Sequence, residues 1–488
     1  MSGMAVAQNT ANLVTVVLPE EPDNIDGCNA NRSSTGRVVR NNIVEALAEI
    51  DPADGSVKPR LATSWERIDE FRWRFKLRQG VKFHDGEDFN AANFIKGMAR
   101  TMDPKMDCET RTRMFGGLKV TSEAVDTYTV DVISDKAVPI LPTYMATLML
   151  VSPKQPTDKL STPVGTGPYQ YVSSTNEEIR AKRNDSWWGG KPPVENVRYV
   201  WRTESSVRAA MVKIGEADIT PVISVNDAND TAIDQSYPNS ETSMLRIDAL
   251  VPPLNDRRVR LALNLAFDRK AMTGTMLSKD VIPATQAVGM NIAGHNFDID
   301  KNPIPYDPAR AKQLLAEAKA AGVPVDAEIT MWGRLGLYPN STEVMETFMT
   351  WFKNVGLNVK VRMLEVAEWR KLNVAPFAEN RPPNLLQTQH DNNNGDPVFS
   401  VFYKYACGGA ASTYCDPEFD KEIVRAGSLL GQERVAAWQK IFRSIHEDRL
   451  PEVIMYHMVG YARVGKRINF KPTVATNSEI QISQITFK

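Results

Sequence analysis

Residues 341–363 read STEVMETFMTWFKNVGLNVKVRM, and this stretch decides the fold class. Its first part carries apolar residues at the spacing of one helix face: Val344, Phe348, Trp351, Phe352 and Val355. Gly356 is suited to end such a helix, and apolar residues then alternate with polar ones from 357 to 363, the period of a half-buried strand. The stretch therefore predicts a helix followed by a strand, the unit from which α/β sheets are built.

Another strand is predicted near the start of the chain, where residues 13–18 read LVTVVL. A polar loop rich in Asn, Ser and Gly follows at 23–36, and residues 38–50 are predicted to form a helix. A loop that follows a strand is where an α/β sheet usually places its ligand. The candidate ligand-binding residues in this loop are Asn31, Ser33 and Ser34.

The next part of the chain is predicted to be rich in antiparallel strands. Residues 71–77 read FRWRFKL and alternate apolar with basic side chains, which is typical of a strand with one buried face. The surrounding segment, to about residue 161, is predicted to form a subdomain. Further along, Asp307 and Pro308 are predicted to begin a helix that Gly322 ends, so the second half of the chain is an α/β lobe.

Length and charge limit the classes of function. The chain has 488 residues, more than one hydrophobic core usually holds, so at least two lobes are expected. It carries 58 Lys and Arg against 59 Asp and Glu, and this balance argues against nucleic acid as a partner. No apolar run approaches the roughly 18 residues of a membrane helix, and a water-soluble chain is expected.

The N-terminal residues suggest a compartment. Ala5-Val6-Ala7 has the small-x-small form that signal peptidase cuts. Residues 1–11 are interpreted as the remnant of a truncated signal peptide, and the protein is expected in the periplasm. The alternative is a short tail in which this pattern arose by chance.

Four cysteines are too few for a disulfide scaffold. Cys407 and Cys415 enclose a short loop of Gly, Ala and Ser and are predicted to form one disulfide. Cys28 and Cys108 form a second pair or remain two buried thiols, and their spacing does not decide between these alternatives. No Cys-x-x-Cys occurs, so a redox or zinc-ribbon site has no support.

The common catalytic and metal-binding motifs are missing from the sequence. Residues 165–168 read GTGP, half of a dinucleotide fingerprint, and residues 189–191 read GGK without the rest of a P-loop. There is no His-Glu-x-x-His and no Gly-x-Ser-x-Gly, and the five histidines are scattered. We therefore expect no enzymatic activity, no metal site and no cofactor.

Six segments spread over the chain carry a family resemblance. They are LATSWE at 61–66, WRFKLRQGVKFHDG at 73–86, VGTGPY at 164–169, RNDSWWG at 183–189, NDRRVRLAL at 255–263 and NGDP at 394–397. In this order they resemble the family 5 extracytoplasmic solute-binding proteins, which serve ABC importers for oligopeptides, dipeptides, nickel chelates and related solutes.

The resemblance implies the two-lobed α/β fold of type II periplasmic binding proteins (cluster C), with a β-rich subdomain inserted in lobe one. Such proteins hold a small ligand where the lobes meet, close by a hinge, and deliver the ligand to an ABC permease in the inner membrane. A monomer without bound cofactor is expected. The implied organisation is a tail at 1–11, lobe one at 12–45, 164–243 and 465–488, the inserted subdomain at 46–163, and lobe two at 244–464.

The ligand expectation rests on departures from the family's peptide-binding pattern. Peptide binders have an Asp three residues before the Asp of the Asn-Gly-Asp-Pro motif, and here Asn393 stands there. The Arg that holds the carboxylate in dipeptide binders has no counterpart at 341–343. The polar run around Asn393 suits hydroxyl or amide groups, which favours a polyhydroxylated, opine- or sugar-like solute such as an oligosaccharide. The candidate contacts are His390, Asn392, Asn393 and Asp396, with Trp332 and Trp369 as stacking surfaces.

Alternatives remain open at this point. Residues 392–394 could instead make Asx-turns within a loop. An oligopeptide recognised through its backbone is the alternative ligand, and a metallophore or haem is another. A secreted hydrolase that uses carboxylates or His390 is the alternative from a different functional class.

Overall fold

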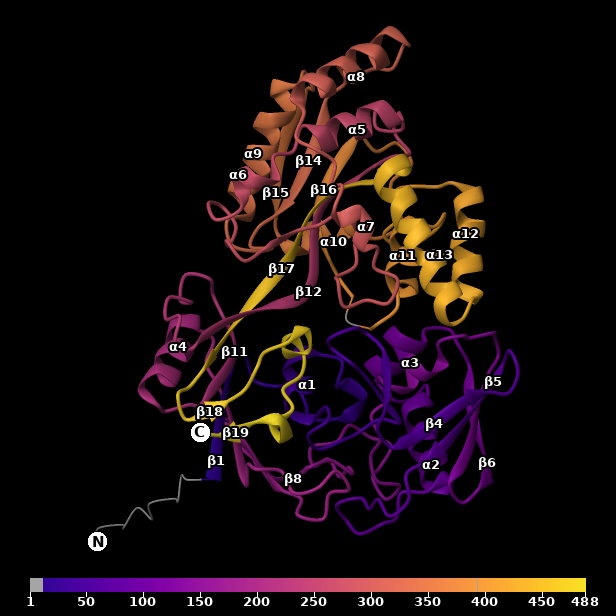
Figure 1. Ribbon diagram of the computed structural model, residues 1–488, viewed down its shortest axis with the longest axis vertical. Coiled ribbons are helices and arrows are strands. Elements are labelled where there is room, and N and C mark those ends of the chain that lie inside the picture. Colours follow the sequence, from indigo (N-terminus) through magenta and orange to yellow (C-terminus); the bar gives the residue numbers. More distant parts are fainter. Residues whose placement is uncertain (1–11, 393) are drawn as a thin grey trace. The chain divides into compact units, whose positions relative to one another are not determined.

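A computed structural model describes residues 12–392 and 394–488, so the predicted signal-peptide remnant lies outside the described residues. The chain forms two compact units (Figure 1). Unit 1 contains the described residues up to Pro52, Val57–Tyr237 and Gly460–Lys488, and unit 2 contains Ala53–Ser56 and Pro238–Val459. Apart from Ala53–Ser56, unit 2 runs from Pro238 to Val459, whereas the sequence placed the start of lobe two at 244 and its end at 464.

Unit 1 is built on a mixed sheet around β1 (Leu13–Leu18), the strand that the sequence predicted. β1 runs parallel to β10 (Asn196–Trp201) and β11 (Ile219–Ile223). Its alternate residues Val14, Val16 and Leu18 are fully buried in the core of the unit. β9 (Glu178–Arg183) and β8 (Tyr169–Ser174) extend this sheet beyond β10, while β18 (Ile468–Asn469) and β19 (Thr486–Phe487) form a separate two-stranded sheet. The helices α1 (Ser33–Val39) and α4 (Ser205–Ile214) also belong to unit 1.

The predicted β-rich subdomain is a separate sheet within unit 1 (Figure 1). Its strand order is β4 (Ala62–Arg67), β5 (Arg72–Leu77), β7 (Thr129–Ser134) and β6 (Val120–Asp126). β5 confirms the predicted strand from residue 72 onward, because Trp73, Phe75 and Leu77 are buried while the basic residues between them are not. Phe71, predicted to share the buried face, lies before the strand and is 41% exposed. The helices α2 (Ala91–Met102) and α3 (Leu141–Met145) complete this layer.

Unit 2 confirms the helix and strand predicted from residues 341–363. They are α9 (Ser341–Asn354) and β15 (Val359–Leu364), and Val344, Phe348 and Phe352 are fully buried. β15 pairs in parallel with β14 (Ile329–Arg334), which pairs in parallel with β16 (Asn384–Asp391). The long strands β12 (Asp234–Ile247) and β17 (Glu452–Val464) contribute residues to both units.

Helices flank the sheet of unit 2 (Figure 1). The helix predicted from Asp307 is α8 (Pro308–Ala320), and the Asp307 side chain caps it by accepting a hydrogen bond from the Arg310 backbone N–H. The other elements are α5 (Arg257–Leu265), α6 (Arg269–Met272), β13 (Ile282–Pro283), α7 (Phe297–Asp300), α10 (Val366–Asn373), α11 (Val398–Tyr405), α12 (Pro417–Ser428) and α13 (Gly431–Ser444).

The helix predicted for 38–50 is wrong. The structure ends α1 at Val39, and the next residues turn sharply because Asn41 adopts a positive φ of 55°. The segment then extends into β2 (Ala48–Ile50), which pairs with β3 (Val57–Pro59). Two consecutive Asn residues at 41 and 42 favour this turn, since Asn tolerates the left-handed region better than other non-glycine residues.

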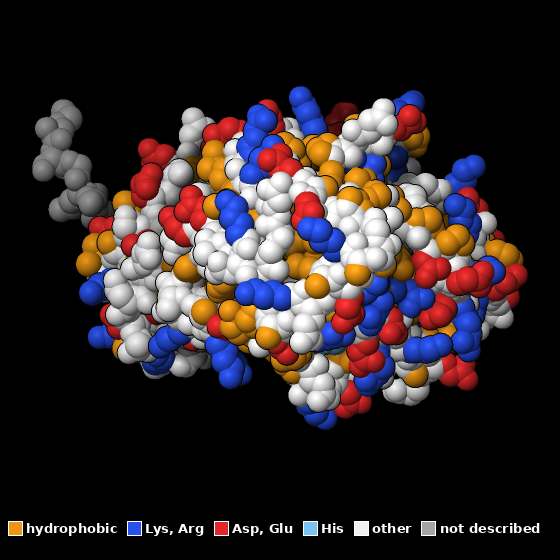
Figure 2. Space-filling view, turned by 90° about the horizontal axis from the view of Figure 1, so that it is seen from above, with side chains coloured by type: hydrophobic (Ala, Val, Ile, Leu, Met, Phe, Trp, Pro, Cys, Tyr) orange, Lys and Arg blue, Asp and Glu red, His pale blue; other side chains and the backbone are white. Residues whose placement is uncertain are grey.

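The structure contains the Cys407–Cys415 disulfide and also joins Cys28 to Cys108, the pair that the sequence left open. None of the helices formed by residues 12–392 and 394–488 is both long enough and apolar enough to cross a bilayer. Acidic and basic side chains are mixed over the face shown in Figure 2, in keeping with the balanced charge.

Candidate functional site

The candidate site of unit 2 lies where its parallel strands end. β14 and β16 run in the same direction and finish at Arg334 and Asp391. In α/β sheets, ligands bind at the carboxyl ends of such strands. We call this region the polar edge of unit 2, and its residues are Glu241, Arg334, His390, Asp391 and Asn392.

Two carboxylates face each other at the polar edge. Glu241 on β12 is the register partner of Asp391 on β16. The Ser240 hydroxyl donates a hydrogen bond to Asp391 Oδ1 at 2.6 Å, and Asn239 Nδ2 donates to Glu241 Oε2 at 3.4 Å. Burial and the charge of Asp391 raise the pKa of Glu241 to about 7. Glu241 therefore gives up its proton less readily than an ordinary glutamic acid.

Arg334 supplies the positive charge of this edge. Its guanidinium lies over the Trp369 ring, 5.3 Å from the ring centroid, and its charge lowers the pKa of Glu241 slightly against the larger effects of burial and Asp391. Trp369 is largely buried against Leu364 and Leu386 and donates its indole N–H to the Gln387 carbonyl at 2.8 Å. The edge therefore carries both signs of charge.

The two tryptophans predicted as stacking surfaces each have an arginine over the ring. Arg334 lies over Trp369, and Arg362 lies 5.6 Å from the centroid of Trp332. Both rings belong to the same small apolar cluster on one face of the sheet. Their role in stacking on a ligand stays a prediction.

His390 is held in the neutral form. Its Nε2 lies 2.7 Å from the Ser400 hydroxyl, and its ring stacks on Tyr403 with centroids 6.2 Å apart. Burial, with a smaller contribution from the charge of Lys404, lowers the pKa of His390 to about 3. A neutral His390 can accept or donate a hydrogen bond but does not balance the acidic pair.

The loop after β16 is bonded internally. Asn392 Nδ2 donates to the Asp396 carbonyl at 3.1 Å and to the Ser400 hydroxyl at 2.6 Å, and Asn392 Oδ1 accepts from the Asn394 backbone N–H at 3.1 Å. The Asp396 carboxylate binds Arg434 through both oxygens, at 2.7 and 2.8 Å. These bonds match the loop alternative considered for this run. Asn393 lies outside the described residues, and ligand contacts by these residues stay a prediction.

The predicted residues of unit 1 lie after β1. Asn31 Nδ2 donates to the Thr110 hydroxyl at 2.8 Å, Ser33 begins α1, and Ser34 is buried. Their contacts with a ligand likewise stay a prediction.

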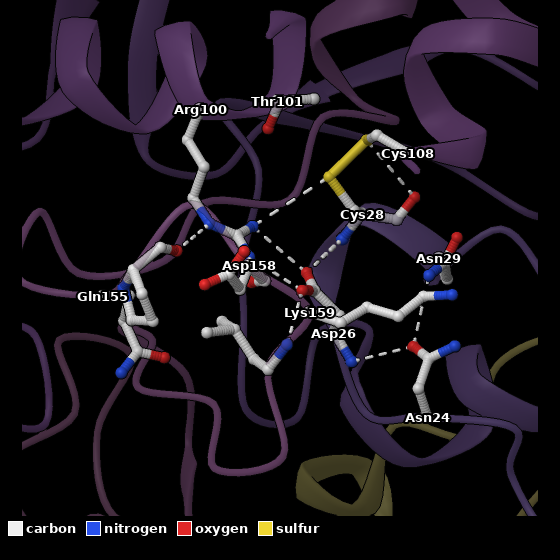
Figure 3. Close-up of polar contacts among 12 residues, drawn as sticks. Asn24, Asp26, Cys28, Asn29, Arg100, Thr101, Cys108, Gln155, Asp158 and Lys159 are labelled. Atoms are coloured by element: carbon white, nitrogen blue, oxygen red, sulfur yellow. Dashed lines mark hydrogen bonds and ion pairs between the residues drawn. A yellow bond between two sulfur atoms is a disulfide. The ribbon is translucent and has the colours of Figure 1, made fainter. Parts of the chain in front are cut away.

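A buried carboxylate fixes the loop that carries these residues (Figure 3). Asp26 accepts from Arg100 Nη1 and Nη2 at 3.2 and 2.8 Å. It also accepts from the backbone N–H groups of Cys28 and Leu160, both at 2.9 Å. We call Asp26, Arg100 and these two N–H groups the Asp26 cluster. Because these hydrogen bonds form within unit 1, the Asp26 cluster stabilises the fold of this unit.

Sequence reasoning missed Glu241 and Arg334. The available signal for Arg334 was the apolar run at 329–332, which ends in a glycine and an arginine and predicts a buried strand with a charged C-terminal end. Glu241 had no comparable signal, because its neighbour Asp391 is 150 residues away in the sequence and meets it only through strand pairing.

Comparisons with known proteins agree with the fold. The family model for bacterial extracellular solute-binding proteins, family 5, matches residues 56–412. The chain is 26% identical to heme-binding protein A of Haemophilus influenzae, over 91% of this chain and 86% of that protein. It is 25% identical to the probable di/tripeptide-binding protein 5 of Pseudomonas aeruginosa, over 92% of this chain and 91% of that one.

A solved structure supports the same architecture. HbpA2 from Haemophilus parasuis superposes with a TM-score of 0.85 at 22% identity, covering 98% of this chain and 100% of that one. The match covers both units. The chain belongs to the family 5 bacterial extracellular solute-binding proteins, which are not enzymes, and it is the substrate-binding component of an ABC importer.

Proposed function

We propose that the protein captures a short peptide for its importer. The observation that carries this proposal is the likeness to a di/tripeptide-binding protein over nine-tenths of both chains. Neither of the two named relatives, nor the solved structure, carries a sugar or an opine in its name. The peptide alternative therefore replaces the preference for a polyhydroxylated solute.

The polar edge of unit 2 supports a peptide. The facing carboxylates Glu241 and Asp391 offer negative charge to an α-ammonium group, although Asn393 lacks the charge that peptide binders place at that position. Burial is the main cause of the raised pKa of Glu241 and the charge of Asp391 is the second, and an ammonium group between the two carboxylates would relieve the repulsion between them. A neutral sugar would leave that repulsion in place.

A thermal-shift screen tests the proposal. The panel contains dipeptides, tripeptides and longer peptides, each in free and N-acetylated form, with oligosaccharides and opines for comparison. Ligand at a hundredfold excess over its Kd stabilises the protein by about 2.7 kcal/mol. We expect a shift with free peptides that N-acetylation reduces. A shift with sugars or opines and none with any peptide would reject the proposal.

Heme is the second candidate, because one relative of nearly full-length coverage is named a heme-binding protein. An absorbance scan of the protein with heme distinguishes the two candidates. A Soret band that shifts on titration, together with no peptide response in the thermal-shift screen, would favour heme.

The cellular location of the protein and its transport partner belong to the same proposal. We place the protein in the periplasm as a monomer that passes its ligand to a permease in the inner membrane. Recovery of the peptide from the denatured complex by mass spectrometry should show it unchanged, since a binding protein returns its ligand intact. Cleaved peptide would instead favour a hydrolase.

A further inference from the structure

Arg334 is the arginine of the polar edge of unit 2 and lies at the end of β14. Its Nε is buried and makes no hydrogen bond within 12–392 and 394–488, and no carboxylate of those residues lies within ion-pair distance of its guanidinium. Arg434 in the same unit, by contrast, is bidentate with Asp396. A partly buried guanidinium without an anion is costly unless another molecule supplies one.

The surroundings hold Arg334 in a fixed position. Its backbone N–H donates to Gln387 Oε1 at 3.1 Å, and its carbonyl accepts from the Ser341 hydroxyl at 3.3 Å. Gln387 is itself fixed, since its Nε2 donates to the Tyr338 hydroxyl at 2.9 Å and to the Ser341 carbonyl at 3.0 Å. The backbone at the end of β14 is therefore anchored on two sides.

The guanidinium plane is also supported. It lies over Trp369, whose ring is fixed by packing against Leu364 and Leu386 and by its hydrogen bond to the Gln387 carbonyl. A guanidinium on an aromatic ring keeps its N–H donors free in the plane, and this arrangement loses little side-chain entropy when an anion binds. Arg334 is prepared for a planar anion.

We propose that Arg334 binds a carboxylate of the ligand at the polar edge of unit 2. The inference rests on the proposed peptide function and makes it more specific, since it requires a peptide with a free C-terminus. A carboxylate matches the two parallel N–H donors of a guanidinium, whereas a carboxamide matches them poorly. The acidic pair Glu241 and Asp391 lies on the same edge and suits the opposite charge, so the edge as a whole fits a zwitterion.

The test compares peptide acids with their C-terminal amides by calorimetry. The probes are the strongest peptide of the thermal-shift screen and the same peptide amidated, and the variants are Arg334→Gln and Arg334→Lys. A hydrogen-bonded pair with a charged group is worth about 1.5–3 kcal/mol, which corresponds to roughly 10- to 150-fold in Kd. We expect the wild-type protein to bind the acid more tightly than the amide by a factor in this range.

The variants should change that ratio in different ways. Arg334→Gln removes the charge and should bring the ratio of the two Kd values close to one. Arg334→Lys keeps the charge without the planar donor pair and should retain an intermediate ratio. Arg362→Gln is the matched control, because Arg362 also lies over a tryptophan of the same cluster, and it should keep the wild-type ratio.

The outcomes separate the two proposals. If peptides bind but Arg334→Gln discriminates acid from amide as well as the wild type does, the carboxylate inference is wrong while the peptide function stands. If no peptide binds any of the proteins, the proposed function fails and this inference fails with it. The melting temperature of unliganded Arg334→Gln should not fall, because the variant removes a buried polar atom that lacks a partner.

Discussion

Asp26 in unit 1 and Glu241 in unit 2 are both carboxylates removed from water, but their surroundings are opposite. Asp26 is fully buried and accepts hydrogen bonds from Arg100 and from two backbone N–H groups. Glu241 is partly buried and faces another carboxylate, Asp391. Both residues belong to polar groupings at the ends of strands or in the loops that follow them.

This difference separates charged groups that stabilise the fold from charged groups that are able to bind a ligand. Where the protein supplies every partner, as in the Asp26 cluster, the group stabilises the fold and has no capacity left for a ligand. Where like charges meet or a guanidinium lacks an anion, the folded state carries a cost that a ligand can relieve. The following predictions test this distinction.

The largest effect is expected for Asp26→Ala. The change leaves Arg100 as a buried charge without its carboxylate and also removes the acceptor for the N–H groups of Cys28 and Leu160. Breaking a buried pair in this way costs about 3–5 kcal/mol of unfolding free energy. Chemical denaturation measures the loss. The control is Asp23→Ala, whose side chain is 64% exposed, and it should cost less than about 1 kcal/mol. Equal losses for the two variants would contradict the structural role.

An effect of comparable size is expected when Cys28 and Cys108 are both replaced by Ala. This disulfide adjoins the Asp26 cluster and links residues 80 apart, so its loss frees a long loop in the unfolded chain. The loop-entropy model gives about 4.5 kcal/mol. The matched control replaces Cys407 and Cys415, which are 8 residues apart, and should cost about 2.5 kcal/mol. Unfolding curves of both variants decide the order, and a reversed order would contradict it.

Glu241→Gln should change the pH dependence of stability. The pKa of Glu241 is about 7 in the folded protein against 4.5 ordinarily, so the folded state holds a proton that the unfolded state has lost between these values. Stability from this group is therefore lost as pH rises from about 4.5 to about 7. The variant avoids that loss.

We expect the advantage of Glu241→Gln over the wild type to grow by about 2–3 kcal/mol across that interval, after allowance for partial exposure. Denaturation curves without ligand at several pH values measure this difference. Glu346→Gln, on the exposed face of α9, is the control and should show no such trend. A constant difference between Glu241→Gln and the wild type would mean that the pKa of Glu241 is not raised in the folded protein.

Much of the fold could be predicted because it depends on local patterns. The helix α9 and the strand β15 follow from apolar spacing, and the start of α8 follows from the Asp-Pro pair that caps it. The helix predicted at 38–50 failed because the turn at Asn41 and the pairing of β2 with β3 outweigh helical propensity there.

The candidate site was harder to predict from the sequence than the fold. Sequence reasoning selected the polar run at 390–396, which the family motif marks, but within the described residues of that run the structure uses Asn392 and Asp396 for internal bonds. Sequence spacing could not show that Asp396 meets Arg434, because they are 38 residues apart and the helices α11 and α12 lie between them. Glu241, which faces another carboxylate, and Arg334, whose Nε has no hydrogen-bond partner among the described residues, were not selected.

The sequence by itself determined that this is an α/β chain with a β-rich insertion and the motifs of a family 5 binding protein, because periodicity and motifs are properties of neighbouring residues. The tertiary structure alone decided which charges are satisfied, because strand pairing sets Glu241 opposite Asp391 and the fold places no carboxylate of the described residues beside Arg334. Whether a charged group has a partner of opposite charge depends on contacts between distant residues, and no local sequence pattern encodes these contacts.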